Sequence, residues 1–427
     1  MIFNEIKYDS MKEHIFCGTH ESGLRVFVLP KTGFTKNYAI YATAFGSINN
    51  TFVPLGEEEV VTVPDGIAHF LEHKMFEEET GTNIFDEFAR LGANANAFTS
   101  SSMTAYLFSA TDFFYENLEV LLGYVNRPYF TPENIEKEQG IIGQEIRMYD
   151  DSPDWQVYIG VLRGLYQKHT ARLDIAGTVE SIAQIDQQAM YRCYNTYYHP
   201  SNMCLFVAGN VEPDKVGALV EKQLAGRTIA PPVKEFFPAE PEAVCASVVE
   251  KKMNVAMPQF VLAFKDNEIS GKDRLKHGAE AELLCDLIAG ESTDFYQSLY
   301  KEGLINEGFS GAYEGDKSFG FATFYGESKN PMEVKKRIME RIAQMKAEGI
   351  NKEDLERMKR QNIGRFIRGL DRVEDIANVY ISHALMGEDY MQYPEALASV
   401  THQDLEALIT RLFKEELATI SIVWPID

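Results

Sequence analysis

The sequence predicts an α+β protein made of two similar halves, each a mostly antiparallel sheet with helices packed on one side. Strand-like and helix-like segments alternate along the 427 residues, and neighbouring strand-like segments are placed as hairpins would be. This order favours layers of helix on antiparallel sheet. Residues 351–357 resemble residues 131–137 at an offset of 220 positions (351 − 131). A repeat of this kind indicates an internal duplication.

A proline-rich segment separates the two halves. Residues 227–244 contain four prolines together with a lysine and three glutamates, a composition typical of linkers. We therefore expect one half at residues 1–226, the linker at 227–244, and the second half at 245–427. The linker also implies that the two halves enclose a chamber.

Local signals place the elements within each half. Segments rich in β-branched and aromatic residues predict strands. Asp65, Thr82 and Thr131 each precede a helix-like segment as capping residues, Gly92 ends one, and residues 49–64 are expected to be a loop. The expected strands are 24–29, 38–45, 104–109, 203–208, 260–264 and 319–325. The expected helices are 65–76, 83–91, 112–126, 132–148, 155–166, 185–197, 276–288, 294–302 and 331–346.

The helix expected at residues 65–76 carries the most informative pattern. Residues three and four apart share a helix face, so His69, Glu72 and His73 point the same way, with Phe76 next on that stripe. Two imidazoles one turn apart can hold one metal ion, and a glutamate beside them can reach its water. The competing interpretation is a helix with two surface histidines. A second, apolar stripe can anchor the helix on a core and consists of Ile67, Phe70, Leu71 and Met75.

Two later segments bear on the same region. On the helix at 132–148, Glu138 and Glu145 share a face. Two carboxylates placed in this way ordinarily mark only a side of the helix that is exposed to solvent. In the segment at 94–99, the small residues Ala95 and Ala97 would let another backbone come close, as a sheet edge that receives an extended peptide requires. A hairpin with small packing residues explains this segment equally well.

Composition excludes some classes of partner. The net charge of −23, from 64 acidic and 41 basic residues, argues against nucleic acid and against an anionic membrane surface. It would suit a cationic peptide, although a soluble acidic surface explains it as well. No segment is long and apolar enough to span a bilayer, and the first residues lack the pattern of a secretory signal. The five scattered cysteines predict reduced core thiols in a cytoplasmic protein.

The H-x-x-E-H pattern, with a glutamate 72 residues further on (145 − 73), resembles the pitrilysin/insulinase family of zinc peptidases, the inverzincins. Residues 91–99 and 136–147 also match that family, and the layout in two halves extends the resemblance over nearly the whole chain. In detail the chain is most similar to the bacterial YmfH-type members, which are related to the mitochondrial processing peptidase.

The resemblance implies a role for each matching residue. His69, His73 and Glu145 would ligate Zn²⁺ and leave one position open, as catalytic zinc sites do. Glu72 would be the general base, and Glu138 a carboxylate that supports a ligand. The residues that would contact a peptide substrate are Asn96, Ala97, Phe98 and Phe76.

The chain departs from the family in its second half. Members that work alone carry there an Arg and a Tyr seven residues apart that hold the substrate carbonyl, but residues 299–307 contain no Arg, and Tyr300 stands near the Arg position. The helix matching the metal-binding one offers only His277, and Arg365 stands where the repeat would place Glu145. We therefore expect this half to serve as a wall and support, without a metal.

These expectations combine into one function. The sequence predicts a zinc-dependent endopeptidase that cleaves peptides or small unfolded polypeptides. It would work with a homologous subunit that supplies the Arg/Tyr pair, or otherwise as a homodimer or monomer in which Tyr300 or Lys301 replaces the Arg. The alternative is a non-catalytic peptide-binding or scaffold member of the same family.

Overall fold

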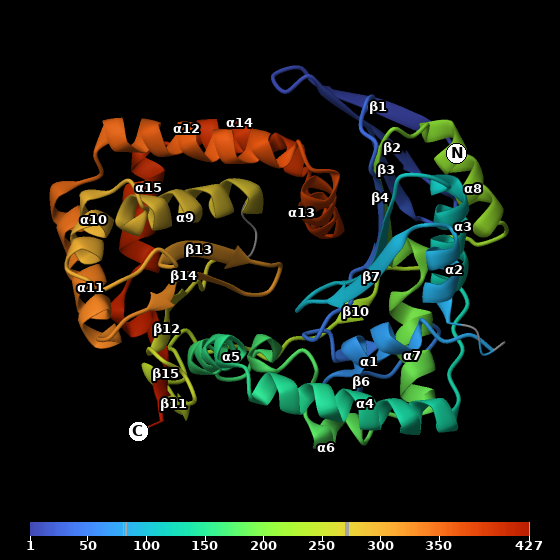
Figure 1. The fold of residues 1–427 in the computed structure, drawn as a ribbon, viewed down its shortest axis with the longest axis horizontal. Helices are drawn as coiled ribbons and strands as arrows, with labels where there is room; N and C mark the ends of the chain where they lie inside the picture. The colour runs from blue at the N-terminus through green and yellow to red at the C-terminus, as the bar shows by residue number, and fades with distance from the viewer. Residues whose placement is uncertain (80, 82, 270–272, 427) are drawn as a thin grey trace. The chain divides into compact units, whose positions relative to one another are not determined.

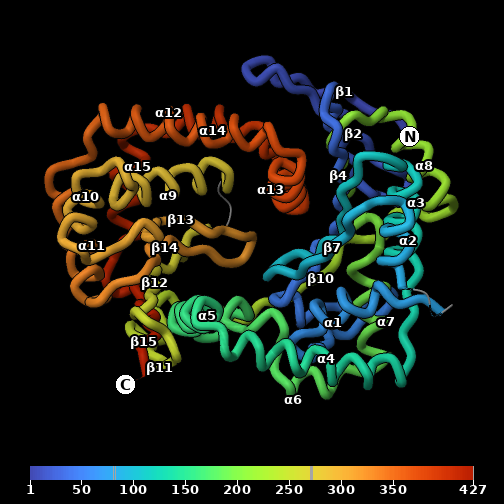
Figure 2. Tube along the Cα trace, viewed as in Figure 1, coloured from blue at the N-terminus to red at the C-terminus, as the bar shows by residue number. Residues whose placement is uncertain are grey.

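The computed structural model describes residues 1–79, 81, 83–269 and 273–426 (Figures 1 and 2). These residues form two compact units, each of which combines a mostly antiparallel sheet with helices. The predicted α+β class is therefore confirmed.

The first unit is built on a seven-stranded sheet in which only the pair β3–β9 is parallel. β4 and β9 are buried along their whole length, because helices cover both faces of the sheet there. Figure 1 shows α3 and α8 on one side of these strands and α13 on the other. In spatial order the strands are β1 (Phe3–Tyr8), β2 (Glu13–Thr19), β3 (Arg25–Pro30), β9 (Met203–Gly209), β4 (Asn37–Thr43), β8 (Thr104–Ala110) and β7 (Asn94–Thr99).

Most helices of the first unit lie where the sequence predicts them. The exceptions are α6, α8 and α13, which were not among the expected segments. The helices are α1 (Ile67–Lys74), α2 (Ile84–Arg90), α3 (Phe114–Val125), α4 (Pro132–Asp150), whose last turn extends into the second unit, α6 (Val179–Ile182), α7 (Gln187–Tyr197), α8 (Pro213–Gln223) and α13 (Val373–Met386).

The second unit is built on a five-stranded sheet in which only β11–β15 is parallel. Its strands, in spatial order, are β11 (Val248–Met253), β15 (Ala418–Pro425), β12 (Gln259–Lys265), β14 (Gly320–Glu327) and β13 (Ser310–Gly315). Its helices are α5 (Pro153–Leu165), α9 (Arg274–Ala289), α10 (Asp294–Lys301), α11 (Pro331–Glu348), α12 (Lys352–Gly369), whose last turn extends into the first unit, α14 (Tyr393–Ser399) and α15 (His402–Leu412).

Each unit also contains a helix from the other half of the chain. Helix α5 packs on the second sheet, where Gly160 and Gly164 lie so close to Ser421 and Thr419 that a Cβ at either glycine would clash. Helix α13 packs on the first sheet through Tyr380, whose ring lies against two phenylalanines of that sheet. The compact units are therefore not continuous in sequence. The boundaries of the duplicated halves, at 226 and 245, stay a prediction.

Three local expectations need correction or comment. The loop expected at 49–64 contains β5 (Thr51–Val53) and β6 (Val61–Thr62), which form a small sheet with β10 (Lys234–Glu235) from the linker. The expected cap at Thr82 lies outside the described residues, and the side chain of Asn83 caps α2. Cys245 is exposed and Cys17 is half-buried, so the prediction of core thiols holds for three of the five free cysteines.

Within the described ranges, helices that combine enough length with enough apolar character to cross a membrane are absent.

Candidate metal centre

Helix α1 begins through a glycine. Gly66 has a φ of 91°, a left-handed conformation that favours glycine, and a Cβ there would lie 2.5 Å from the backbone oxygen of Ala176. The expectation that Asp65 caps this helix is wrong, because its carboxylate accepts a hydrogen bond from Asn50 Nδ2 (2.9 Å) and no side chain caps the helix. The start of α1 is thus fixed by contact with the loop at Ala176.

The two predicted stripes of α1 are both present. Its apolar residues are almost completely buried, which fixes the rotation of the helix about its axis. The opposite stripe brings His69 and His73 against Glu145 of α4, with the two imidazole rings 4.5 Å apart between centroids. The buried apolar residues are Ile67, Phe70, Leu71 and Met75.

His69, His73 and Glu145 converge as metal ligands would. His69 Nε2 lies 3.6 Å from one carboxylate oxygen of Glu145, and His73 Nε2 lies 3.3 Å from the other. Zinc bonds of about 2.1 Å at tetrahedral angles place neighbouring donors roughly 3.4 Å apart. The donor set and its spacing therefore fit a single zinc ion. Within the described part of the chain, this is the only group of three such residues that could hold a metal ion.

Glu138 contacts the ring nitrogen of His73 that faces away from Glu145. Its Oε1 lies 3.1 Å from His73 Nδ1, so His73 is fixed with Nε2 toward Glu145. Such a carboxylate–histidine pair orients a metal ligand and raises its basicity. His69 Nδ1, by contrast, is buried and has no hydrogen-bond partner among the described residues. His73 is thus the more firmly positioned of the two histidines.

Lys74 joins this network and was missed by the sequence reasoning. Its side chain is fully buried, and its Nζ lies 2.6 Å from Glu77 Oε2 and 3.5 Å from Glu138 Oε2. The pattern contains a signal for it, because Lys74 lies three and seven residues after Leu71 and Ile67 and so falls on the apolar stripe. A buried lysine requires a carboxylate partner.

The charges of the site favour a bound cation. Burial alone would lower the pKa of His73, but hydrogen bonds to Glu138 and Glu145 outweigh it and raise this pKa to about 10. Hydrogen bonds from both histidines hold the pKa of Glu145 well below its usual range. The pKa of Glu138 is also lowered, because His73 and Lys74 outweigh its burial. A dication at the ligand atoms would take the place of the proton that these carboxylates stabilise on His73.

Glu72 lies beside the ligand group without belonging to it. Its carboxylate accepts a hydrogen bond from Thr99 Oγ1 (2.7 Å), at the end of β7. Burial raises the pKa of Glu72, while the neighbouring histidines and Thr99 oppose that rise. Thr99 is a second residue that the sequence reasoning did not identify. A carboxylate held in this way can accept a proton from a water molecule at the ligands.

Strand β7, which carries Asn96, Ala97 and Phe98, is the edge strand of the first sheet. The prediction of a sheet edge is confirmed, and β7 is also one arm of a hairpin with β8, so both interpretations of the segment hold. The backbone N–H of Ala97 donates to Asn96 Oδ1 (2.9 Å) instead of to a neighbouring strand. This N–H is thus a donor that an added strand can take over.

Phe76 lies two residues after the end of α1, in an aromatic cluster. It stacks on Phe85 with 4.4 Å between ring centroids, and the rings of Tyr106 and Tyr124 lie within 6 Å. The side chain is half-buried, so one part of it packs in the core of the unit.

The corresponding residues of the second half take part in other networks. His277 Nε2 lies 2.5 Å from Asp266 Oδ2 in the core, and Arg365 pairs with Asp286 at 3.0 Å. Tyr300 donates its hydroxyl to Glu307 Oε1 (3.3 Å).

Comparisons with known proteins agree on one family. The family model described as Insulinase (Peptidase family M16) matches residues 62–179, and the model described as Peptidase M16 inactive domain matches residues 184–362. A relative from Bacillus subtilis (strain 168), named an uncharacterized zinc protease, YmfH, is 42% identical over 98% of this chain and 99% of its own length.

Solved structures extend this similarity to the fold. The crystal structure of an M16-like peptidase from Alicyclobacillus acidocaldarius matches with a TM-score of 0.92 and 32% identity, over 100% of this chain and 99% of that one. A protease from Helicobacter pylori matches with a TM-score of 0.80 over 96% of this chain and 99% of that one, at 20% identity, and shows the fold alone.

Proposed function

Because this chain belongs to the insulinase (M16) peptidase family, we propose that it is a zinc-dependent endopeptidase that cleaves peptides or small unfolded polypeptides. The observation that carries the proposal is the convergence of His69, His73 and Glu145 within 4.8 Å of one another, with Glu72 beside them. Three protein ligands leave a fourth position free, which is the pattern of a catalytic zinc site.

The chain's own residues supply the proton transfers. When bound, a zinc ion would supply Lewis acidity for an attacking water and for the carbonyl of the scissile bond. Glu72, held by Thr99, accepts the proton that the water loses as its oxygen bonds to the carbonyl carbon. As the C–N bond breaks, Glu72 returns this proton to the leaving amine, and the products are a carboxylic acid and an amine.

Strand β7 positions the peptide. A substrate in extended conformation can pair with the free edge of β7, where the N–H of Ala97 is already turned away from β8. Backbone pairing reads the shape of the chain more than its side chains. We therefore propose a loose sequence preference at this strand.

Metal analysis and hydrolysis test the proposal together. We expect about one zinc ion per chain after gentle purification, and hydrolysis of a mixture of unstructured peptides that is abolished by a chelator and restored by added zinc. A non-catalytic binding or scaffold member of the family would bind these peptides without cleaving them at any zinc concentration. Protein purified gently without a stoichiometric transition metal would contradict the proposal.

We further propose that the chain needs a second subunit for full activity. The family model described as Peptidase M16 inactive domain matches residues 184–362. Within that part of the chain, residues 299–307 around Tyr300 contain no arginine that could hold a substrate carbonyl. A homologous subunit that carries an Arg and a Tyr would supply this support. The alternative is a monomer or homodimer in which Tyr300 or Lys301 replaces the Arg. A cytoplasmic location completes the proposal.

The partner proposal predicts low activity of the chain alone. Loss of electrophilic support costs on the order of 10²–10³ in kcat, so hydrolysis should rise by about this factor when a homologous subunit with the Arg/Tyr pair is added. The assay compares the purified chain alone with the mixture on the same peptides. If the chain alone is fully active and Tyr300→Phe or Lys301→Ala lowers this activity, the result would favour the monomer or homodimer in which one of these residues replaces the Arg. Full activity insensitive to both substitutions would reject both versions.

A further inference from the structure

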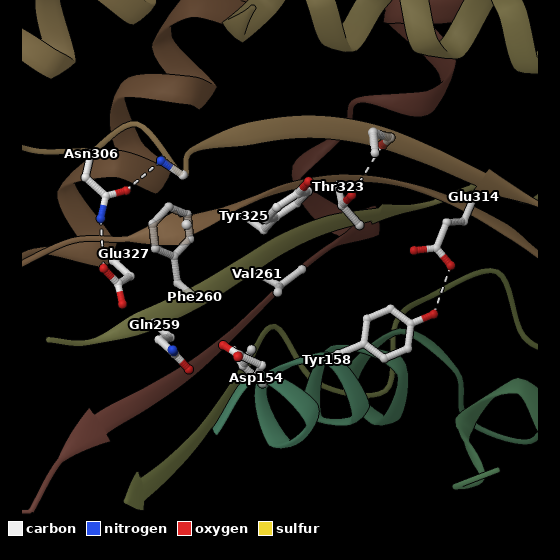
Figure 3. Close-up of a pocket in the computed structure, with 14 residues that line it drawn as sticks. Asp154, Tyr158, Gln259, Phe260, Val261, Asn306, Glu314, Thr323, Tyr325 and Glu327 are labelled. Atoms are coloured by element: carbon white, nitrogen blue, oxygen red, sulfur yellow. Dashed lines mark hydrogen bonds between the residues drawn. The ribbon is translucent and has the colours of Figure 1, made fainter. Parts of the chain in front are cut away.

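A second concave site lies in the second unit, between one face of its sheet and helix α5. It is a cavity of about 550 Å³, within the range of small-ligand sites. Figure 3 shows Asp154 and Tyr158 on the α5 side and residues of β12, β13 and β14 on the sheet side. All its lining residues belong to one compact unit.

The charged groups of this cavity are all acidic. Asp154, Glu314 and Glu327 line it, and among the described residues its lining includes no lysine, arginine or histidine. Tyr158 Oη donates to Glu314 Oε2 (2.8 Å), and Asn306 Nδ2 donates to Glu327 Oε2 (2.8 Å), so the hydrogen-bond donors that these two glutamates have are neutral. Across the described ranges, none of the three carboxylates forms an ion pair.

Glu314 shows the consequence of this arrangement. Glu314 is an exposed residue, but protein atoms close to its carboxylate raise its pKa, against the hydrogen bond from Tyr158. The side chains in Figure 3 show the Tyr158–Glu314 pair at one end of the cavity and the Asn306–Glu327 pair at the other. A bound cation at either end would compensate the negative charge of the glutamate there.

The middle of the cavity is apolar and aromatic. Val261 and Val157 contribute aliphatic surface, and Tyr325 presents a ring that is 42% exposed. This combination suits an arginine side chain, whose three methylene groups pack on apolar surface and whose planar guanidinium stacks on a ring and donates to carboxylates. A lysine ammonium is more strongly hydrated and does not stack in this way.

We propose that this cavity binds an arginine side chain of a peptide and gives the protein a preference for basic peptides. The volume exceeds that of one arginine side chain, so a neighbouring residue of the peptide has room as well. That the ligand is a peptide rests on the proposed peptidase function. The pocket itself rests on the charges and shape described above.

Peptide binding to full-length protein tests this. The protein carries Glu72→Gln so that nothing is cleaved, and the probe is a fluorescent unstructured peptide with a single arginine. A matched probe has citrulline, which keeps the shape of arginine without its charge. We expect the arginine probe to bind more tightly by on the order of tenfold, and Glu314→Gln to remove most of this difference.

Two further variants make the outcome decisive. Glu353→Gln removes an equal charge from an exposed position on α12 and should leave the difference unchanged. Tyr325→Ala should reduce the difference through lost stacking, and it serves as the test if Glu314→Gln fails to fold. The proposal would be overturned if the two probes bound with equal affinity. It would also be overturned if Glu353→Gln reduced the affinity difference as much as Glu314→Gln does.

Failure of this proposal is distinguishable from failure of the proposed function. The binding assay does not depend on cleavage. If wild-type protein does not hydrolyse peptides but the arginine probe still depends on Glu314, the peptidase proposal falls and the pocket stands. If hydrolysis is found but arginine and citrulline probes bind alike, the pocket falls and the peptidase proposal stands.

Discussion

Glu72→Gln is expected to lower kcat for peptide hydrolysis by roughly 10³-fold or more while the chain keeps its zinc. Glutamine has nearly the shape of glutamate and can still accept the hydrogen bond from Thr99 through its amide oxygen. It cannot accept a proton from the attacking water or return one to the leaving amine. Because Glu72 lies outside the group of ligands, the metal content should not change.

The measurement is kcat on an unstructured peptide, in the active assembly, together with zinc per chain. Glu79→Gln is a suitable control, since Glu79 is an exposed carboxylate seven residues further along the chain and its substitution is expected to leave both quantities unchanged. Near-normal hydrolysis by Glu72→Gln would show that another group takes the proton. A parallel loss of zinc would show instead that Glu72 is a ligand.

Much of this arrangement follows from local rules in the sequence. The H-x-x-E-H spacing on a helix dictates that His69 and His73 share a face, and the apolar stripe at Phe70 and Leu71 dictates which side is buried. The structure has both features. The small residues around Ala97 left two interpretations open, a sheet edge and a hairpin, and β7 is both.

Other parts of the site depend on tertiary contacts that spacing does not encode. Glu145 lies on a different helix from the histidines, and periodicity alone does not reveal which face of α4 meets α1, so its assignment required resemblance to a family. Asp65 looks like a helix cap locally, yet Asn50 competes for its carboxylate. Lys74 sits on the buried stripe because two carboxylates compensate its charge: Glu77, three residues further on, and Glu138, which is distant in sequence.

The packing of α5 and α13 shows that tertiary partners of whole helices also cannot be read from sequence patterns. An amphipathic pattern predicts that a helix buries one face, but it does not say against which sheet. Tyr380 of α13 packs on Phe206 of the first sheet although the helix follows the second half's strands β12 to β14 in the chain. The duplication at an offset of 220 residues therefore predicts that similar helices and strands recur, but it does not predict which sheet each helix packs on.

Glu145→Gln is expected to lose most of its zinc, in contrast to Glu72→Gln. The carboxylate of Glu145 faces both His69 Nε2 and His73 Nε2, at 3.6 and 3.3 Å. A neutral amide is a much weaker ligand for a dication than a carboxylate is, so the affinity should fall by at least the roughly 10–100-fold that loss of a supporting residue costs. Hydrolysis should fall with the metal content.

Thermal unfolding measures this loss without any assay of activity. A ligand that binds only the folded chain stabilises it by an amount that grows with the logarithm of its concentration divided by its Kd, and so raises Tm. Added zinc should therefore raise the Tm of the metal-free wild type and of Glu72→Gln, but hardly that of Glu145→Gln. Glu138→Gln should fall between them, because Glu138 orients His73 without touching the ligand position. A zinc-dependent rise in Glu145→Gln equal to that of the wild type would show that the third ligand lies elsewhere, and the donor set assigned to His69, His73 and Glu145 would then be wrong.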